Sequence, residues 1–267
     1  MKKGSESWKT NNKMKQQMKV SLILTTYNCK DNLISTLQSI DRQDYSDIEV
    51  VIKDGVSTDG TLDVIREYAD EHPNVLWKSD QDEGLYDALN QGIQMATGDI
   101  IAICNDLFTV DDAVSRFVNV IEQNPECSGA HSDLIYADGD KIVRYWKMGQ
   151  GQISQGWMPG HPSLYLKRQV YEKYGLYNTS YKCSADYEFM IRMLKDNAVK
   201  LEYIPEVLIQ MYYGGTSTGS ADSYITSVRE GVRALKSNHV KHALGITILR
   251  TIRVIIQFVN GKMKMGK

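Results

Sequence analysis

The feature that most constrains the fold is a regular alternation of apolar strands and amphipathic helices over residues 20–104. Four apolar runs have the length of strands, at residues 20–26, 48–52, 75–77 and 100–104. Between them, apolar residues recur every three or four positions, which is the spacing of one helix face. Strands that alternate with helices predict a parallel sheet joined by right-handed crossovers. We therefore expect an α/β protein with a Rossmann-like, mostly parallel sheet flanked by helices.

The turn at residues 54–61, DGVSTDGT, lies between a strand and a helix. Such a turn exposes backbone N–H groups and short polar side chains, and in an open α/β sheet it lies at the edge that binds ligands. Ser57 or Asp59 could equally be an ordinary cap of the following helix. The turn contains neither GxGxxG nor GxxxxGK[ST], so the sequence gives little support to a dinucleotide or P-loop site.

Asn105 and Asp106 directly follow the apolar run at 100–104. A carboxylate at this position offers a hard oxygen ligand for Mg²⁺ or Mn²⁺, and such an ion can hold a diphosphate. The alternative is that Asp106 only caps the turn before Asp111 and Asp112, which we expect to begin a helix.

In the second half of the chain we expect two strands around the turn at 138–140, at residues 128–137 and 141–148. Tyr145, Trp146 and Trp157 supply aromatic surface here. Ligand rings can stack on such a surface, although large aromatic residues more often fill a core. Asp186 begins a further helix, where an acid can also serve only the helix dipole.

The net charge of −2 is distributed unevenly. Residues 1–19 have a net charge of +5 and residues 241–267 of +6, which leaves −13 for the segment between them. An acidic body argues against nucleic-acid binding, and basic ends are typical of tails that meet an anionic membrane or are solvated. The cysteines lack zinc-like spacing and no apolar stretch follows the N-terminal lysines, so we expect a cytoplasmic protein.

Several motifs together resemble one known family: TTYN at 25–28, KDGVSTDGT at 53–61, DEGLYDALNQGI at 82–93, TGDIIAICND at 97–106, the long segment at 159–192, and GGTS at 214–217. In this order they resemble family 2 glycosyltransferases of the GT-A fold, in particular bacterial polysaccharide and O-antigen glycosyltransferases. The resemblance implies four parts: a basic tail at 1–18, a nucleotide-sugar-binding half at 19–108, an acceptor-binding half at 109–220, and a helical extension at 221–267.

The resemblance also implies roles for single residues. Asp54 would accept a hydrogen bond from the base, most often uracil, and Asp186 would be the general base. Asp106 would bind Mn²⁺ or Mg²⁺ as part of an Asp-x-Asp motif. Other donor-side residues would be Thr26, Tyr27, Asn28, Ser57, Asp59, Asp82, Gly84, Asp87 and Asn90. The acceptor or phosphate side would include His161, Arg192, Gly214 and Gly215.

The metal motif departs from the family pattern. The run Cys104-Asn105-Asp106-Leu107-Phe108 is shorter by about two positions than the resemblance implies, so one acid remains, with Asn105 as a neutral oxygen partner. This departure leaves open a metal-independent or inactive protein.

A C-terminal helix is expected to be amphipathic, with one apolar face formed by Ile248, Leu249, Ile252, Ile255, Ile256 and Val259. Arg250 and Arg253 interrupt an apolar run of fewer than about 18 residues, which argues against a membrane-spanning helix. We expect a basic helix that lies in the membrane interface. The alternatives are a helix docked on the protein's own core or on the second subunit of a homodimer.

The sequence thus predicts an inverting glycosyltransferase that acts by single displacement in cell-surface polysaccharide synthesis. Its donor would be a nucleotide sugar, a UDP-hexose or UDP-N-acetylhexosamine, with UDP binding strengthened by manganese. Its acceptor would be a saccharide on a lipid diphosphate at the inner face of the cytoplasmic membrane. The alternatives are a catalytically silent nucleotide-sugar-binding scaffold and a nucleotidyltransferase, which would need a basic phosphate loop that the first turn lacks.

Overall fold

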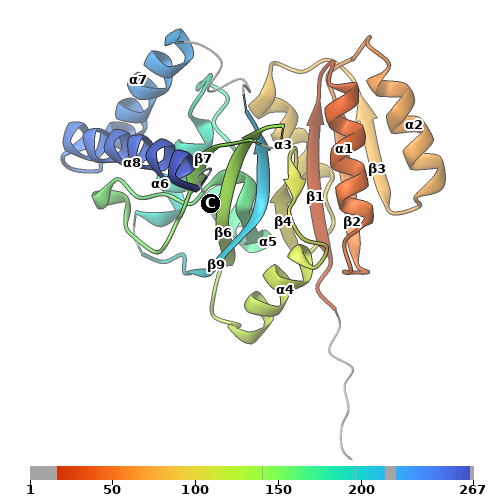
Figure 1. The fold of residues 1–267 in the computed structure, drawn as a ribbon, viewed down its shortest axis with the longest axis horizontal. Helices are drawn as coiled ribbons and strands as arrows, with labels where there is room; N and C mark the ends of the chain where they lie inside the picture. The colour runs from red at the N-terminus through yellow and green to blue at the C-terminus, as the bar shows by residue number, and fades with distance from the viewer. Residues whose placement is uncertain (1–16, 140, 196, 214–220, 265–267) are drawn as a thin grey trace, which may run out of the picture.

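The computed structural model describes residues 17–139, 141–195, 197–213 and 221–264. The described residues contain one mixed sheet whose neighbouring strands follow the order β3-β2-β1-β4-β8-β6-β9-β5, with β7 paired to β6. Helices flank this sheet, as Figure 1 shows, so the expected α/β architecture is confirmed.

The first half of the chain is the predicted parallel unit. Its strands are β1 (Val20–Thr26), β2 (Ile48–Asp54), β3 (Val75–Ser79) and β4 (Ile100–Ile103). Parallel pairs join β1 to β2, β2 to β3 and β1 to β4. Strands β2 and β3 each run two residues further than expected, which brings Asp54 and Ser79 to the carboxyl ends of the strands. The intervening helices are α1 (Lys30–Asp41), α2 (Thr61–Glu71) and α3 (Leu85–Met95).

Alternation along the strands builds two cores, one on each face of the sheet. Leu22 and Leu24 of β1 pack in the cluster that includes α1 and α2, whereas Ile23 packs in the cluster that includes α3. Successive side chains of a strand point to opposite faces, so a strand buried on both faces must be apolar throughout. This requirement explains the uninterrupted apolar runs in the sequence.

The second half adds strands of both directions, three of which, at residues 107–108, 164–167 and 201–212, were not predicted from the sequence. The elements here are β5 (Leu107–Phe108), α4 (Ala113–Gln123), β6 (Gly129–Asp138), β7 (Lys141–Trp146), η1 (Ile153–Gln155), η2 (His161–Ser163), β8 (Leu164–Lys167), α5 (Arg168–Tyr174), α6 (Ala185–Leu194) and β9 (Leu201–Tyr212). The expected pair around residues 138–140 is confirmed as β6 and β7. The missed β8 lies antiparallel between β4 and β6, and the missed β9 runs parallel to β6.

Two C-terminal helices, α7 (Ala221–Ser237) and α8 (Ala243–Lys264), complete the described structure and lie at the opposite end of the sheet from α1 and α2 (Figure 1). Helix α8 packs against β7 and η1. The contact is close at both ends: a Cβ on Gly156 would lie 2.6 Å from the Arg250 backbone nitrogen, and a Cβ on Gly261 would lie 2.6 Å from the Val143 carbonyl oxygen.

The outer face of α8 is apolar and exposed, as expected, with Ile248 61% and Ile255 58% exposed. Residues Ala243–Gly261 have a mean hydropathy of 1.4, so by length and composition this helix could cross a membrane. Arg250 and Arg253 therefore do not exclude a membrane span on length and composition. The inner face, however, is occupied by the protein itself, since Gln257 is buried and hydrogen-bonded to Arg144.

His131 on β6 is a titratable residue buried in the core. Its ring is fully buried, stacked on Tyr203 and edge-on to Trp157, and within the described ranges neither ring nitrogen has a hydrogen-bond partner. Burial lowers the pKa of His131 to about 4, below the value of about 6.5 expected in the unfolded chain. Below pH 6.5 the unfolded chain binds a proton that the folded protein does not, so stability is lost as the pH falls towards 4.

We predict that His131→Phe keeps the ring stack and removes this acid sensitivity. Urea unfolding at pH 7 and pH 5 should show that the unchanged protein loses about 2 kcal/mol through this group and that the variant does not. His239→Asn, at an exposed histidine after α7, is the control and should behave as the unchanged protein. An equal loss in His131→Phe would contradict the assignment.

Candidate active site

Asp54 organises the turn after β2. Its side chain is fully buried and accepts hydrogen bonds from Thr26 Oγ1 (2.9 Å), Ser57 N (3.0 Å), Ser57 Oγ (2.5 Å) and Ser79 Oγ (2.6 Å). Burial alone would raise the pKa of Asp54, but these bonds outweigh it and hold the pKa below its usual range. A carboxylate has about four lone-pair sites. The predicted contact between Asp54 and a base therefore requires one of these donors to move.

The loops after β1 and β2 are interlocked at the edge of the sheet. Asn28, in a left-handed conformation (φ 48°), donates its N–H to Ser57 Oγ (2.9 Å) and accepts the Thr58 N–H on Oδ1 (2.8 Å). The Asp59 carboxylate accepts a hydrogen bond from the backbone at the start of α1 (3.1 Å). The Tyr27 ring beside them is 70% exposed. The structure thus brings together the predicted nucleoside-side residues and leaves one aromatic ring free on the surface.

A buried lysine that the sequence analysis missed ties the third loop to these two. Lys53 is fully buried in β2, and its Nζ donates to the backbone oxygens of Asp54 and Asp80 (both 2.7 Å) and to Asp82 Oδ2 (3.3 Å). A Cβ on Gly55 would lie 2.9 Å from the same Asp82 oxygen, so this close approach requires glycine. A buried ammonium is costly unless it is paired. A single lysine inside the run IEVVIKD was the signal available in the sequence.

The turn into α3 contains three more predicted residues. Asp82 Oδ1 accepts the Gly84 N–H (3.0 Å), and Asp87 Oδ2 accepts the Glu83 N–H (3.1 Å). Gly84 has φ 114°, which disfavours any residue with a Cβ. These side chains shape the turn and remain at least partly exposed beside the loops after β1 and β2.

Helix α3 also contacts the second half of the chain. Asn90 was predicted to line the sugar side, but its buried amide donates to the Tyr177 carbonyl (2.9 Å) and accepts the Tyr177 N–H (2.8 Å). One turn earlier, the Tyr86 hydroxyl donates to Asp186 Oδ1 (3.1 Å). Burial and then the charge of Asp186 raise the pKa of Tyr86, so this hydroxyl remains a donor. Sequence analysis missed Tyr86 because its position also fits the apolar face of α3.

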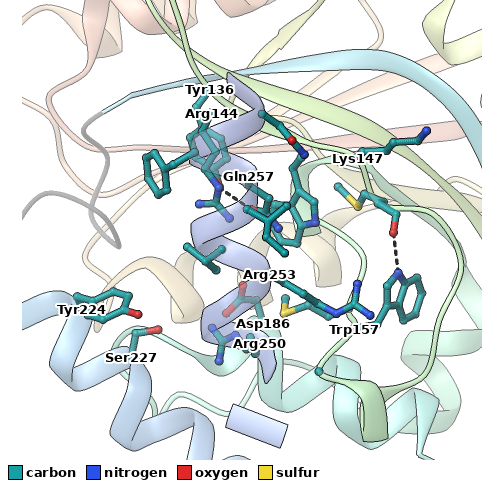
Figure 2. A pocket seen from close by; sticks show the side chains of 18 of the residues that line it. Tyr136, Arg144, Lys147, Trp157, Asp186, Tyr224, Ser227, Arg250, Arg253 and Gln257 are labelled. Atoms are coloured by element: carbon teal, nitrogen blue, oxygen red, sulfur yellow. Dashed lines mark hydrogen bonds between the residues drawn. The ribbon is translucent and has the colours of Figure 1, made fainter. Parts of the chain in front are cut away.

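Asp186, the predicted general base, lines a cavity of about 320 Å³. It lies in the first turn of α6 and is half-buried. Figure 2 shows α8 crossing this cavity and α7 supplying Tyr224 and Ser227. The predicted aromatic residues Trp146 and Trp157 also line it, whereas Tyr145 bonds to Asp133 (3.0 Å). The cavity therefore places a carboxylate, which can act as a general base, beside aromatic surface on which a ring can stack.

His161 lies in η2 near Asp186. Burial lowers the pKa of His161, and the Asp186 charge opposes this shift. Its buried Nε2 has no hydrogen-bond partner among the described residues. The ring is therefore a neutral imidazole with one unused polar atom, which fits either a structural ring or a ligand contact.

Asp106 follows β4 at the same edge of the sheet as Asp54. Among the described residues it accepts one hydrogen bond, from Tyr212 N (3.4 Å), and burial raises the pKa of Asp106 to about 7. Its neighbour Asn105 is turned to β1, where it accepts the Thr25 N–H (2.8 Å) and donates to Thr25 Oγ1 (2.9 Å). In the described ranges no group of three or more His, Cys, Asp or Glu could hold a metal ion.

Asp106 offers a single carboxylate, so it fits a metal ion only where the substrate supplies further ligands. Mg²⁺ is usually bound by one or two carboxylates together with substrate phosphates, and a nearby cation would lower the raised pKa of Asp106. The residues present therefore fit an ion shared with a diphosphate, and they do not fit an all-protein cage.

The Tyr136 ring is near both carboxylates. Burial raises the pKa of Tyr136, and the charges of Asp106 and Asp186 raise it further.

Three predicted residues lie away from this arrangement or outside the described chain. Arg192 pairs with Glu188 (2.9 Å) and donates to the backbone oxygens of Tyr174 and Leu176, so it joins α6 to the end of α5. Gly214 and Gly215 fall outside the described residues.

The donor-side loops and the cavity with its carboxylate can be compared with known proteins. A family model described as Glycosyl transferase family 2 matches residues 21–190, from β1 to α6. The chain belongs to glycosyltransferase family 2. This membership decides against the nucleotidyltransferase hypothesis.

Relatives of this family 2 glycosyltransferase cover most of the chain. A PGL/p-HBAD biosynthesis glycosyltransferase of Mycobacterium bovis is 31% identical over 232 residues, which are 80% of this chain and 86% of that protein. WfaP of Escherichia coli, a UDP-Glc:alpha-D-GlcNAc-diphosphoundecaprenol beta-1,3-glucosyltransferase, is 27% identical over 178 residues, or 66% of this chain and 70% of that protein.

A solved structure supports the fold. The mannosyltransferase PcManGT from Pyrobaculum calidifontis, in complex with GDP-Man and Mn²⁺, superimposes with a TM-score of 0.65 and 20% identity, over 92% of this chain and 74% of that one. The GT-A fold expected from the motifs is confirmed.

Proposed function

We propose that this family 2 glycosyltransferase is an inverting enzyme that moves a sugar from a UDP-sugar to a saccharide carried on a lipid diphosphate. The observation that carries the proposal is Asp186, a carboxylate held by the Tyr86 hydroxyl in the wall of an aromatic cavity. Helix α3, which provides Tyr86, begins directly after the loop at Asp82, so the base is tied to the donor-side loops.

In the proposed reaction, Asp186 takes the proton of the acceptor hydroxyl as that oxygen attacks the anomeric carbon of the donor sugar. The bond from this carbon to the diphosphate breaks on the opposite side, and UDP leaves with the bonding electrons. One displacement inverts the anomeric configuration and needs no covalent intermediate. Tyr86 orients the carboxylate throughout, and His161 offers a neutral donor near the same place.

The donor is proposed to be a UDP-hexose or UDP-N-acetylhexosamine. WfaP, whose name specifies UDP-Glc, supports this class of donor. The loops after β1, β2 and β3 would hold the nucleoside, with the exposed Tyr27 ring available for stacking on the base. Asp106 would hold Mn²⁺ or Mg²⁺, which supplies positive charge for the departing diphosphate.

The acceptor is proposed to lie at the inner face of the cytoplasmic membrane, with α8 resting on the lipid surface. Support comes from the diphosphoundecaprenol acceptor in the name of WfaP and from the exposed apolar face of α8. Arg250 of α8 stacks on Tyr187 and Arg253 is hydrogen-bonded to Gln155, so apolar contact rather than charge attraction would dominate binding.

A catalytically silent nucleotide-sugar-binding scaffold is the second candidate. The orientation of Asn105 towards Thr25 favours it, because the shortened motif then offers a single acidic ligand.

Asp186→Asn keeps the side-chain size and removes the base. With a synthetic polyprenyl-diphosphate-linked N-acetylglucosamine as acceptor, we expect UDP release to fall by about 10³-fold, because a general base typically contributes 10²–10⁴-fold. UDP binding measured by calorimetry should not change. Asp70→Asn, exposed on α2, is the matched control. Turnover retained in Asp186→Asn would contradict the assignment, and UDP binding without turnover in the unchanged protein would support the scaffold.

Manganese should strengthen UDP binding by about tenfold, or 1.4 kcal/mol, and Asp106→Asn should abolish this gain. The comparison is calorimetric titration of UDP with and without MnCl₂. Asp111→Asn is the matched control, since that exposed acid pairs with Arg42 instead (3.4 Å). Indifference to manganese would remove the metal from the proposal, and tighter binding of GDP would overturn the base preference.

Ile252→Glu places a charge on the exposed face of α8 and should abolish co-sedimentation with phosphatidylglycerol-containing vesicles. Leu76→Glu, at a similarly exposed apolar residue on β3, is the control and should still co-sediment. If α8 instead formed a homodimer interface, light scattering would give twice the chain mass for the unchanged protein and a monomer for Ile252→Glu.

A further inference from the structure

Arginine side chains gather around the cavity that holds Asp186. Arg144 comes from β7, and Arg250 and Arg253 come from α8 (Figure 2). In the described part of the chain none of the three has a carboxylate within ion-pair distance. Arg144 is buried, Arg250 is half-buried and Arg253 is exposed. Buried arginines normally have anionic partners.

Arg144 is buried (7% exposed), and its position is fixed on several sides. Its Nε donates to Gln257 Oε1 (2.6 Å), and its guanidinium lies 4.6 Å from the Tyr136 ring and 5.0 Å from the Trp146 ring. No protein acceptor among the described residues bonds to its other nitrogens. Burial lowers the pKa of Arg144, and the positive charge of Arg250 lowers it further. The two cations thus repel each other across a cavity wall.

Arg250 is placed by a stacking contact and by a glycine. Its guanidinium lies 4.1 Å from the Tyr187 ring, one residue beyond Asp186. A Cβ on Gly231 of α7 would lie 2.7 Å from Arg250 Nη1, so glycine leaves the space that the guanidinium occupies. Arg253 is anchored through Nε to the Gln155 carbonyl (3.2 Å). All three arginines are therefore held in place, and each retains N–H groups that bond to no acceptor among the described residues.

The basic side chains that line the cavity outnumber the acidic ones. Arg144, Arg250, Arg253 and Lys147 oppose the single carboxylate of Asp186. No residue of the donor-side loops or of β4 lines the cavity, because the first lining residue in the chain is Tyr136. The excess positive charge therefore belongs to the side from which an acceptor approaches, and guanidinium groups match phosphate oxygens in geometry and charge.

We propose that Arg144, Arg250 and Arg253 form a subsite for the diphosphate of the acceptor. The inference rests on the proposed function and specifies its substrate class: an acceptor saccharide joined to a diphosphate, whose reacting hydroxyl reaches Asp186 while the phosphates contact α8. The lipid then leaves along the apolar outer face of the same helix, where Ile252 and Ile255 are exposed. The UDP moiety is the other source of a diphosphate, and the experiment separates the two.

The test is calorimetric binding of farnesyl diphosphate to the full-length protein at saturating UDP. We expect Arg250→Gln to weaken this binding at least tenfold and Arg250→Lys to restore part of it, because lysine keeps the charge and loses the planar fork. Gly231→Ala should weaken it as well, since the new methyl group displaces Arg250 while alanine favours the helix. Arg229→Gln, exposed on α7, is the matched control. UDP affinity should be the same in all four variants.

Thermal unfolding checks that each variant is folded, and farnesol and inorganic pyrophosphate measure the separate contributions of tail and diphosphate. Equal binding of farnesyl diphosphate by the unchanged protein, Arg250→Gln and Gly231→Ala would overturn the inference. A loss of UDP affinity in Arg250→Gln would also overturn it, by assigning the arginines to the donor. If Asp186→Asn leaves transfer intact while farnesyl diphosphate binding still depends on Arg250, the proposed reaction fails and the subsite stands.

Discussion

The contact of α3 with the second half of the chain is the constraint on which the site depends. Asn90 uses both polar groups of its amide on the backbone of Tyr177, and Tyr86 fixes one oxygen of Asp186. The same helix begins at the loop that Lys53 ties to the end of β2. A displacement of α3 would therefore move the loops proposed to bind the donor and the proposed base together. Hydrogen bonds to buried or charged groups are costly to leave unmade, which makes this link rigid.

The parallel half of the fold could be predicted because a strand covered on both faces must be apolar throughout, and such runs are conspicuous. β8 and β9 could not be predicted in the same way. Four residues of β8 follow directly on the turn that holds His161, and β9 contains Pro205 and Glu206 and mixes exposed with buried positions. Their partners are distant in sequence, so pairing rather than local pattern determines them.

The predicted site residues were found mainly by resemblance, and the structure shows what single residues could not reveal. The polar side-chain atoms of Asp54 and Asn90 are already hydrogen-bonded to other residues of the protein. The sequence alone does not distinguish a residue that contacts a ligand from a buried residue that joins two segments of the fold. Lys53 and Tyr86 were missed because each looks like part of an ordinary strand or helix. The arginines of α8 were noticed, but their direction depends on how the helix docks, and the docking depends on close approach at Gly156 and Gly261.

The family match ends at residue 190, whereas α7 and α8 begin at residues 221 and 243. The wall of the cavity opposite Asp186 is thus built from a segment that the shared family pattern does not describe. The carboxylate of Asp186 and the helices that face it are therefore encoded in separate parts of the chain, so α7 and α8 can change in sequence without a change in the part that the family pattern describes.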